Sequence, residues 1–270
     1  MISMYLKGGL GNQLFQIFTA IAYAIDHREK LVFPVYKADI VDRPTYWDTI
    51  LKRLKDGVDP KLNCETIEKY HEPHFHYTPL PKLSTVLFVG YFQSYKYFNA
   101  HYESIYKKLN LKMEQELIKN KYLTLKDTIS LHFRIGDYTN LQLHHVILKD
   151  QYYINSIKEI IKRTNKSDWN IIYFCEVKDN IPVKHRLRKI KKSFPELTFY
   201  KAEDSMLDWE QLLLMSCSDH NIIANSAFSW WAAYLNQNPN KVVCYPKEWF
   251  GAANYDKKTH DLCPPNWISV

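Results

Sequence analysis

The stretch HFRIGDY, residues 132–138, places chemically active side chains at the end of an apolar run. The run TISLHF (128–133) predicts a buried strand, whose side chains alternate between the two faces of a sheet. His132 and Arg134 therefore share one face, and the glycine that follows permits a turn bringing Asp137 back toward Arg134. Because a planar guanidinium suits phosphate oxygens, the stretch indicates an anion site, with a structural Arg–Asp pair as the alternative.

A second polar stretch, KGGLGNQLFQ (7–16), follows the first apolar run of the chain. Gly9 and Gly11 would let backbone N–H groups approach an anion where a helix begins, and Asn12 and Gln13 add amide groups there. No Lys-Ser or Lys-Thr follows, as a P-loop requires, and the third small residue of the dinucleotide fingerprint is missing. A purely structural strand-to-helix turn is the alternative.

The third stretch, IIANSAFSWWAAYL (222–235), indicates a strand that ends at Asn225 and a helix that begins near Phe228. Ser226 is a good helix cap, so the free N–H groups and the hydroxyls of Ser226 and Ser229 would form a second anion cradle. The two tryptophans that follow are more typical of helix packing than of sugar contact.

Strands alternating with helices must position these three stretches. Strands are predicted over 2–6, 30–34, 85–92, 128–133, 170–175, 197–200, 220–225 and 241–246, the last of the chain. Helices are predicted over 14–25, 95–109, 151–163, 208–217 and from 228. This order indicates parallel sheets covered on both faces, where ligands bind beyond the carboxyl ends of the strands. We expect two α/β halves, 1–125 and 126–270, joined by a charged linker near 112–126 and facing a cleft.

The composition excludes several classes of protein. Of 270 residues, 46% are hydrophobic and 24% charged, which is typical of a globular protein, and the net charge of +7 suits an anionic substrate. The basic run KHRLRKIKKSF (184–194) would bind nucleic acid or a membrane surface, but a solvated helix face explains it better. Five scattered cysteines and no 18-residue apolar run indicate a cytoplasmic protein without membrane insertion. The sequence contains neither a D-x-D nor an H-E-x-x-H pattern, so no motif indicates a metal site.

The motifs together resemble a known family. GGLGNQLFQ, GYFQSYKYF, HFRIGDY and HNIIANSAFSWWAAYLN are similar to the motif set of bacterial and viral α-1,2-fucosyltransferases, glycosyltransferase family 11. The similarity runs from residue 7 to the C-terminus. It implies a GT-B-like fold of two Rossmann-like halves, GDP-β-L-fucose as donor, inversion at the fucose carbon, no metal or other cofactor, and a galactose-containing acceptor modified at O2.

Carried over by position, the resemblance implies roles for the residues above. Arg134 would contact the GDP phosphates and His132 would support that contact. The remaining donor residues would be Asn225, Ser226, Phe228 and Ser229 from the second half, and Gly9, Gly11, Asn12 and Gln13 from the first. Asp137 is our candidate for the general base, with His144, His145 and the donor phosphate as alternatives.

The chain departs from the family pattern at two positions. The family reads H-x-R-R-G-D, and here Ile135 replaces the second arginine on the face opposite Arg134. The family has S-D-D after the next strand, where this chain has FCEVKD, so Glu176 takes the carboxylate position and would bind guanosine. A transferase for GDP-mannose or another nucleotide sugar, or a non-catalytic relative that binds sugar nucleotides or glycans, is therefore the alternative.

The acceptor is not specified by these motifs. Region 36–84 would shape its pocket, and several aromatic residues there are either sugar contacts or core packing. These residues are Tyr46, Trp47, His74, Phe75, His76 and Tyr77.

Overall fold

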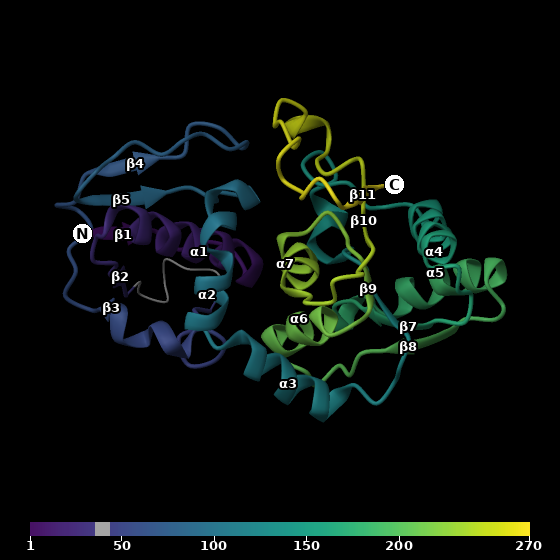
Figure 1. The fold of residues 1–270 in the computed structure, drawn as a ribbon. Coiled ribbons are helices and arrows are strands. Elements are labelled where there is room, and N and C mark those ends of the chain that lie inside the picture. Colours follow the sequence, from purple (N-terminus) through teal and green to yellow (C-terminus); the bar gives the residue numbers. More distant parts are fainter. Residues whose placement is uncertain (36–43) are drawn as a thin grey trace. The chain divides into compact units, whose positions relative to one another are not determined.

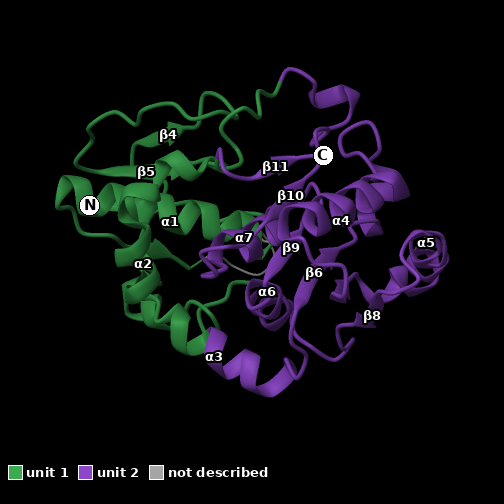
Figure 2. Cartoon of the chain, turned by 45° about the vertical axis from the view of Figure 1, so that its right-hand side comes forward, with its two compact units in different colours: residues 1–114, 257–264 green, residues 115–256, 265–270 purple. Residues whose placement is uncertain are grey.

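The computed structural model describes residues 1–35 and 44–270, which form two compact units (Figure 2). Unit 1 comprises Met1–Glu114 and Lys257–Pro264, and unit 2 comprises Gln115–Asp256 and Pro265–Val270. The division lies within helix α3 (Leu111–Tyr122), earlier than the expected boundary after residue 125. The charged stretch expected to be a linker is helical because Leu111 and Ile118 are buried on one side of it.

Unit 1 contains a short parallel sheet in the order β1-β5-β4 and a separate parallel pair, β2-β3 (Figure 1). Its elements are β1 (Ile2–Met4), α1 (Leu10–His27), β2 (Phe33–Pro34), β3 (Val58–Asp59), β4 (Lys69–His71), β5 (Val86–Val89) and α2 (Tyr102–Lys108). Helix α1 is buried along most of its length, which its run of apolar residues requires. The helix predicted over 95–109 begins only at Tyr102, because two 3-10 turns precede it.

Unit 2 contains a six-stranded sheet in the order β11-β10-β9-β6-β7-β8, with every pair parallel. Its further elements are β6 (Thr128–His132), α4 (Asp150–Thr164), β7 (Asn170–Phe174), α5 (Asn180–Ser193), β8 (Thr198–Lys201), α6 (Asp208–Ser216), β9 (His220–Ile222), α7 (Ala227–Leu235), β10 (Val243–Tyr245) and β11 (Ile268–Ser269). The α/β class with parallel sheets is confirmed. The prediction that 241–246 is the last strand is wrong, because β11 pairs with β10.

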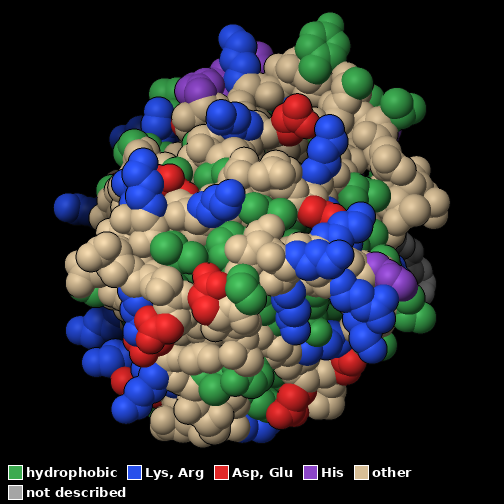
Figure 3. Space-filling model, turned by 90° about the vertical axis from the view of Figure 1, so that its right-hand side faces the viewer, with side chains coloured by type: hydrophobic (Ala, Val, Ile, Leu, Met, Phe, Trp, Pro, Cys, Tyr) green, Lys and Arg blue, Asp and Glu red, His purple; other side chains and the backbone are tan. Residues whose placement is uncertain are grey.

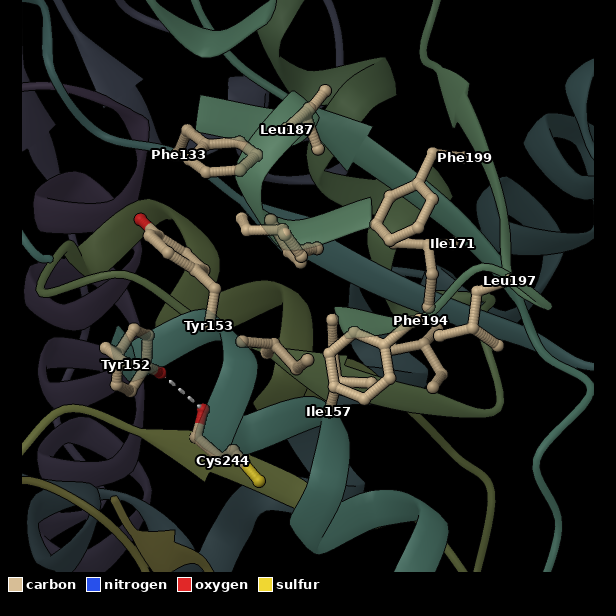
Figure 4. Close-up of a cluster of buried hydrophobic side chains, with 14 of the residues drawn as sticks. Phe133, Tyr152, Tyr153, Ile157, Ile171, Leu187, Phe194, Leu197, Phe199 and Cys244 are labelled. Atoms are coloured by element: carbon tan, nitrogen blue, oxygen red, sulfur yellow. Dashed lines mark hydrogen bonds between the residues drawn. The ribbon is translucent and has the colours of Figure 1, made fainter. Parts of the chain in front are cut away.

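The two faces of this sheet carry different helices. Leu131 and Phe133 point into a cluster of buried side chains that joins the sheet to α4 and α5 (Figure 4). The side chain of Ser130 lies on the opposite face and accepts a hydrogen bond from Asn221 at 2.7 Å. The same Asn221 amide donates to the carbonyl of Met215 in α6, so α6 covers that second face. The alternation predicted for β6 is therefore confirmed.

The direction of chain progression through the six-stranded sheet reverses at β6. The chain passes from β6 to β7 and β8 on one side, and then returns to β9, β10 and β11 on the other. In such sheets ligands bind at this switch point, beyond the carboxyl ends of the two diverging strands. Two of the three polar stretches predicted from sequence follow those strands, β6 and β9.

The described residues include no helix with the length and apolar character needed to cross a bilayer. All five cysteines are free thiols.

Candidate active site

The segments that follow β6 and β9 lie against one another in unit 2. The Tyr138 hydroxyl donates to the backbone carbonyl of Asn225 at 2.9 Å. The rings of His132 and Phe228 are 5.6 Å apart between centroids, which places the end of β6 beside the start of α7. The structure therefore brings the stretches HFRIGDY (132–138) and IIANSAFSWWAAYL (222–235) together at the switch point of the sheet.

Arg134 lies at the centre of a group of charged side chains that we call the Arg134 cluster: Arg134, Asp137, Glu176 and Lys178. Arg134 Nη2 donates to Asp137 Oδ1 at 2.6 Å, and Nη1 donates to Glu176 Oε1. Glu176 Oε2 also pairs with Lys178 Nζ at 2.8 Å. The guanidinium carbon lies 5.2 Å from the centre of the Tyr138 ring, and a fifth of the Arg134 side chain is exposed. The cation is therefore oriented by neighbours and still accessible to an anion.

Asp179 holds the turn that carries this cluster, and sequence analysis did not identify it. Its carboxylate is buried and accepts a hydrogen bond from the Gly136 backbone N–H at 2.8 Å. Gly136 has φ of +25°, and a Cβ there would lie 3.0 Å from a Glu176 carboxylate oxygen. A side chain at this position would strain the backbone and crowd the Glu176 carboxylate, so glycine suits the turn. The feature of the sequence that could have identified it is the position of this acidic residue at the end of the β7–α5 connection.

We expect Asp179→Ala to lower the free energy of unfolding by about 1–3 kcal/mol, because the partly buried Gly136 N–H loses its acceptor. Catalytic activity should fall with it, since the turn no longer fixes Arg134. Asp179→Asn keeps an acceptor oxygen and should lose much less of both. Urea unfolding and initial rates of the two variants measure the difference, and equal stability of the two would contradict the role given to this carboxylate.

His132 is a buried neutral histidine beside the cation. Burial lowers its pKa to about 3, with the Arg134 charge as a second cause. Its Nδ1 atom has no hydrogen-bond partner among the described residues. His132 is therefore uncharged at neutral pH. Its neutral ring helps to form the wall of the site, and its Nδ1 atom makes no hydrogen bond to the described part of the chain.

The low pKa of His132 predicts acid destabilisation. Between pH 6.5 and 3 the unfolded chain binds a proton that the folded chain does not, so stability falls as pH drops through this window. At pH 5 the loss from this residue should be about 2 kcal/mol relative to neutral pH. Urea unfolding at pH 7 and pH 5 should show a smaller loss for His132→Gln than for the wild type. The exposed His185→Gln is the control, and an equal loss in all three proteins would contradict the prediction.

The N-terminus of α7 differs in detail from the cradle predicted from sequence. Ser226 caps the helix as expected, because its Oγ accepts from the Phe228 N–H at 3.4 Å. Ser229 is fully buried, and its Oγ accepts from the Ala224 N–H at 3.2 Å. The Ser229 hydroxyl therefore shapes the loop and is not free for a ligand. What the helix end can offer to an anion is its dipole and its first N–H groups.

Asn225 also has a structural task. Its amide donates to the carbonyls of Val146 and Trp249, each at 3.0 Å, and thereby ties two loops to the end of β9. Its Oδ1 is buried without a hydrogen-bond partner within the described part of the chain. The tryptophans 230 and 231 are fully buried, which confirms that they pack the helix.

The glycine-rich stretch of the first half lies in unit 1. Helix α1 begins after Gly9, and the residue with the left-handed backbone is Gly8, at φ of +77°. Gln13 is fully buried and donates to the carbonyls of Gly8 and Pro44 at 3.0 and 2.9 Å, so its amide N–H groups close the turn. Asn12 accepts from Gln93 at 2.7 Å. Gly11 lies inside the helix.

The aromatic residues expected around the acceptor divide into two groups, all within unit 1. Tyr46 and Trp47 are buried, which favours core packing for them. His74 and His76 stack at 4.9 Å, and Tyr77 lies 4.8 Å from the Tyr97 ring, and all three are at least partly exposed. Residues 36–43 of the expected acceptor region lie outside the described residues.

Comparison with known proteins assigns the chain to a family. The model of glycosyl transferase family 11 matches residues 58–270, which include β6, β9 and the Arg134 cluster. The chain belongs to glycosyl transferase family 11. It is therefore a glycosyltransferase, and its similarities within the family are to fucosyltransferase-like enzymes.

Two curated relatives of this family 11 enzyme match nearly all of its length. An alpha-1,2-colitosyltransferase from Escherichia coli is 25% identical, covering 98% of this chain and 97% of the relative. A galactoside 2-alpha-L-fucosyltransferase from Caenorhabditis elegans is 24% identical, covering 99% of this chain and 78% of the relative. A solved structure of an Arabidopsis thaliana FUT1 mutant in complex with GDP has a TM-score of 0.47 at 10% identity, covering 90% of this chain and 70% of that one, and adds nothing to the assignment.

Proposed function

We propose that this enzyme transfers L-fucose from GDP-β-L-fucose to O2 of a galactose residue in a glycan acceptor, with inversion at the fucose carbon and without a metal ion. The observation that carries the proposal is the position of Arg134 after β6 at the switch point of the sheet, two residues from His132, whose ring lies against Phe228 at the start of α7. Family membership supports the same reaction class. We also propose that the enzyme works in the cytoplasm.

The charge that develops in the reaction lies on the leaving nucleotide. As the bond between fucose C1 and the phosphate oxygen breaks, its electron pair moves to the GDP diphosphate. Arg134 and the N–H groups at the start of α7 would stabilise that charge, and both are held in place before substrate arrives. Because Asp137 and Glu176 occupy two guanidinium nitrogens, the diphosphate must share Arg134 with them or displace one.

Glu176 has a proposed second role toward the base of the nucleotide. A carboxylate that accepts two N–H groups of guanine would distinguish GDP from UDP sugars. Its oxygens pair with Arg134 and Lys178, so guanine binding would exchange one of these contacts.

Asp137 is the proposed general base. The acceptor hydroxyl must lose its proton as it attacks fucose C1 from the side opposite GDP, and a carboxylate near the donor can accept it. Asp137 lies beside Arg134, and 40% of its side chain is exposed, so an acceptor can reach it. We assign acceptor contacts to His74, His76 and Tyr77 because their exposure leaves them accessible to a sugar.

The loss of the second family arginine does not remove the proposed chemistry. Ile135 packs against the core cluster between the sheet and its helices, on the face away from Arg134. The contacts of Arg134 with Asp137 and Glu176 therefore form without it. This geometry favours an active enzyme over a non-catalytic binder.

A second donor deserves direct comparison, because the colitosyltransferase is 25% identical to this enzyme. Colitose lacks the 3-hydroxyl of fucose, so the two donors differ by one polar group. A site that hydrogen-bonds a hydroxyl rejects the analogue without it by several orders of magnitude. Rates with GDP-fucose, GDP-colitose and GDP-mannose would therefore separate the candidate donors.

GDP release tests the proposed reaction. Purified protein is incubated with GDP-fucose, with and without lactose, in the presence of EDTA. The proposal predicts GDP release that depends on the acceptor and persists in EDTA. Binding of GDP-fucose without turnover on a panel of β-galactosides would favour a non-catalytic relative, and failure to bind GDP-fucose in calorimetry would overturn the proposal.

A further inference from the structure

A basic cleft lies between α5 and the outer strands β7 and β8 of unit 2. Its volume is about 390 Å³. It is lined by Tyr173, Asn180, Lys184, Leu187, Arg188, Lys191 and Lys201. Figure 3 shows the side of the protein on which Figure 1 draws α4 and α5, and Lys and Arg side chains cover more of this face than Asp and Glu do. The cleft is thus a hollow within a basic surface.

The three cations that α5 contributes to the cleft, Lys184, Arg188 and Lys191, have no carboxylate partner among the described residues. Helix α5 carries no acidic residue, and Lys184, Arg188 and Lys191 recur along one side of it at the spacing of helical turns. None of these three forms an ion pair with a carboxylate among the described residues. Neighbours on the same helix behave differently, because Arg186 and Lys189 both reach Asp150. Like charges at this spacing repel one another, so an anion in the cleft would relieve that repulsion.

The other polar groups around the cleft offer donors and little negative charge. Lys201 pairs with Asp204, which also accepts from the Asn180 amide at 2.9 Å. Arg188 contacts the His185 ring nitrogen at 3.3 Å, and Lys191 lies 5.3 Å from the centre of the Phe199 ring. Asp204 is therefore the one carboxylate paired with a lining cation among the described residues.

We propose that this cleft binds a small ligand that carries two or more phosphate groups. The planar fork of Arg188 and the flanking ammonium groups match phosphate oxygens, and the volume exceeds what a single phosphate needs. The lining shares no residue with the Arg134 cluster. The site is therefore additional to the proposed donor site. The concave shape favours a discrete soluble ligand over the flat surface of a membrane.

Calorimetric titration with inorganic tripolyphosphate tests the cleft. Three proteins are compared with the wild type: the cleft variant Lys184→Gln/Arg188→Gln/Lys191→Gln, the control Lys158→Gln/Lys162→Gln/Lys192→Gln, and Arg134→Gln. The control removes the same charge from exposed positions outside the cleft lining. We expect affinity to fall by about tenfold or more in the cleft variant, which is the loss typical of charge-assisted hydrogen bonds, and to stay near the wild-type value in the other two.

Other results would overturn the proposal. Equal weakening in the cleft and control variants would show a diffuse charge effect, and loss in Arg134→Gln alone would place the phosphates at the donor site. Absence of tripolyphosphate binding would exclude a soluble phosphate ligand, whether or not the protein sediments with phosphatidylglycerol vesicles. Circular dichroism checks that the variants fold, and the single Arg188→Gln replaces the cleft variant if the triple one does not.

Discussion

Arg134→Gln should lower the rate of fucosyl transfer by about 10²–10³-fold while the protein stays folded. The expected loss is that of a preorganised donor aimed at charge that develops on a leaving group. In the segment that follows β6, Arg134 combines a fixed positive charge with partial exposure. Glutamine retains hydrogen-bonding capacity and removes the charge. GDP affinity should fall as well, because the ground-state diphosphate uses the same cation.

Steady-state rates, calorimetry with GDP and thermal unfolding measure these three effects. Arg163→Gln is the matched control, since Arg163 pairs with Glu159 on the exposed side of α4, outside the Arg134 cluster. It should keep wild-type activity. If Arg134→Gln retains more than about a tenth of the wild-type rate, Arg134 does not stabilise the leaving group.

Asp137→Asn should lower kcat by about 10²–10⁴-fold and leave GDP affinity unchanged or higher. The large loss follows if the carboxylate takes the proton of the attacking hydroxyl. Affinity should not fall because Asp137 pairs with Arg134 at 2.6 Å and would compete with the diphosphate for that cation. The opposite effects on kcat and on GDP binding distinguish a base from a residue that only holds the nucleotide.

Asp168→Asn is the control for this variant, because Asp168 is largely exposed and pairs only weakly with Lys166, at 3.7 Å. Product formation at saturating GDP-fucose and GDP titration give the two quantities. Near-normal kcat in Asp137→Asn would exclude Asp137 as the base and turn attention to His144, His145 or the donor phosphate. A fall in GDP affinity without a fall in kcat would assign Asp137 to nucleotide binding.

Sequence periodicity predicted what depends on neighbours along the chain. The alternation in HFRIGDY correctly separated His132 and Arg134 from the residues that face the core, and Ser226 caps α7 as its residue type predicts. These features follow from the period of a strand and from the preference for serine at a helix start. These two features were sufficient to locate the strand end and the helix start at which the candidate site lies.

Contacts between distant segments could not be predicted in the same way. The switch point exists because β9 follows β7 and β8 in the sequence but pairs with β6 on the opposite side from them. Short β11 becomes a strand only through its pairing with β10. Similarly, residues 257–264 belong to unit 1, where Asp261 accepts from the Tyr77 N–H at 2.9 Å.

The roles of the polar candidate residues in both units were the least predictable. Ser229 and Gln13 are of residue types that often contact ligands. In this structure, however, their side chains form hydrogen bonds with backbone groups. Burying a backbone donor or acceptor without a partner is costly, so such loops recruit nearby side chains. Asp179 does the same for Gly136. Residue type alone cannot separate a side chain that builds a loop from one that meets a ligand.

NMR analysis of the product formed from GDP-β-L-fucose and lactose tests the central claim most directly. The spectrum gives both the anomeric configuration and the position of the new linkage. An α-fucosyl group on O2 of the galactose residue, formed in EDTA, is the predicted product. A β-fucosyl product, a linkage to another hydroxyl, or hydrolysis to free fucose alone would contradict inverting transfer to O2.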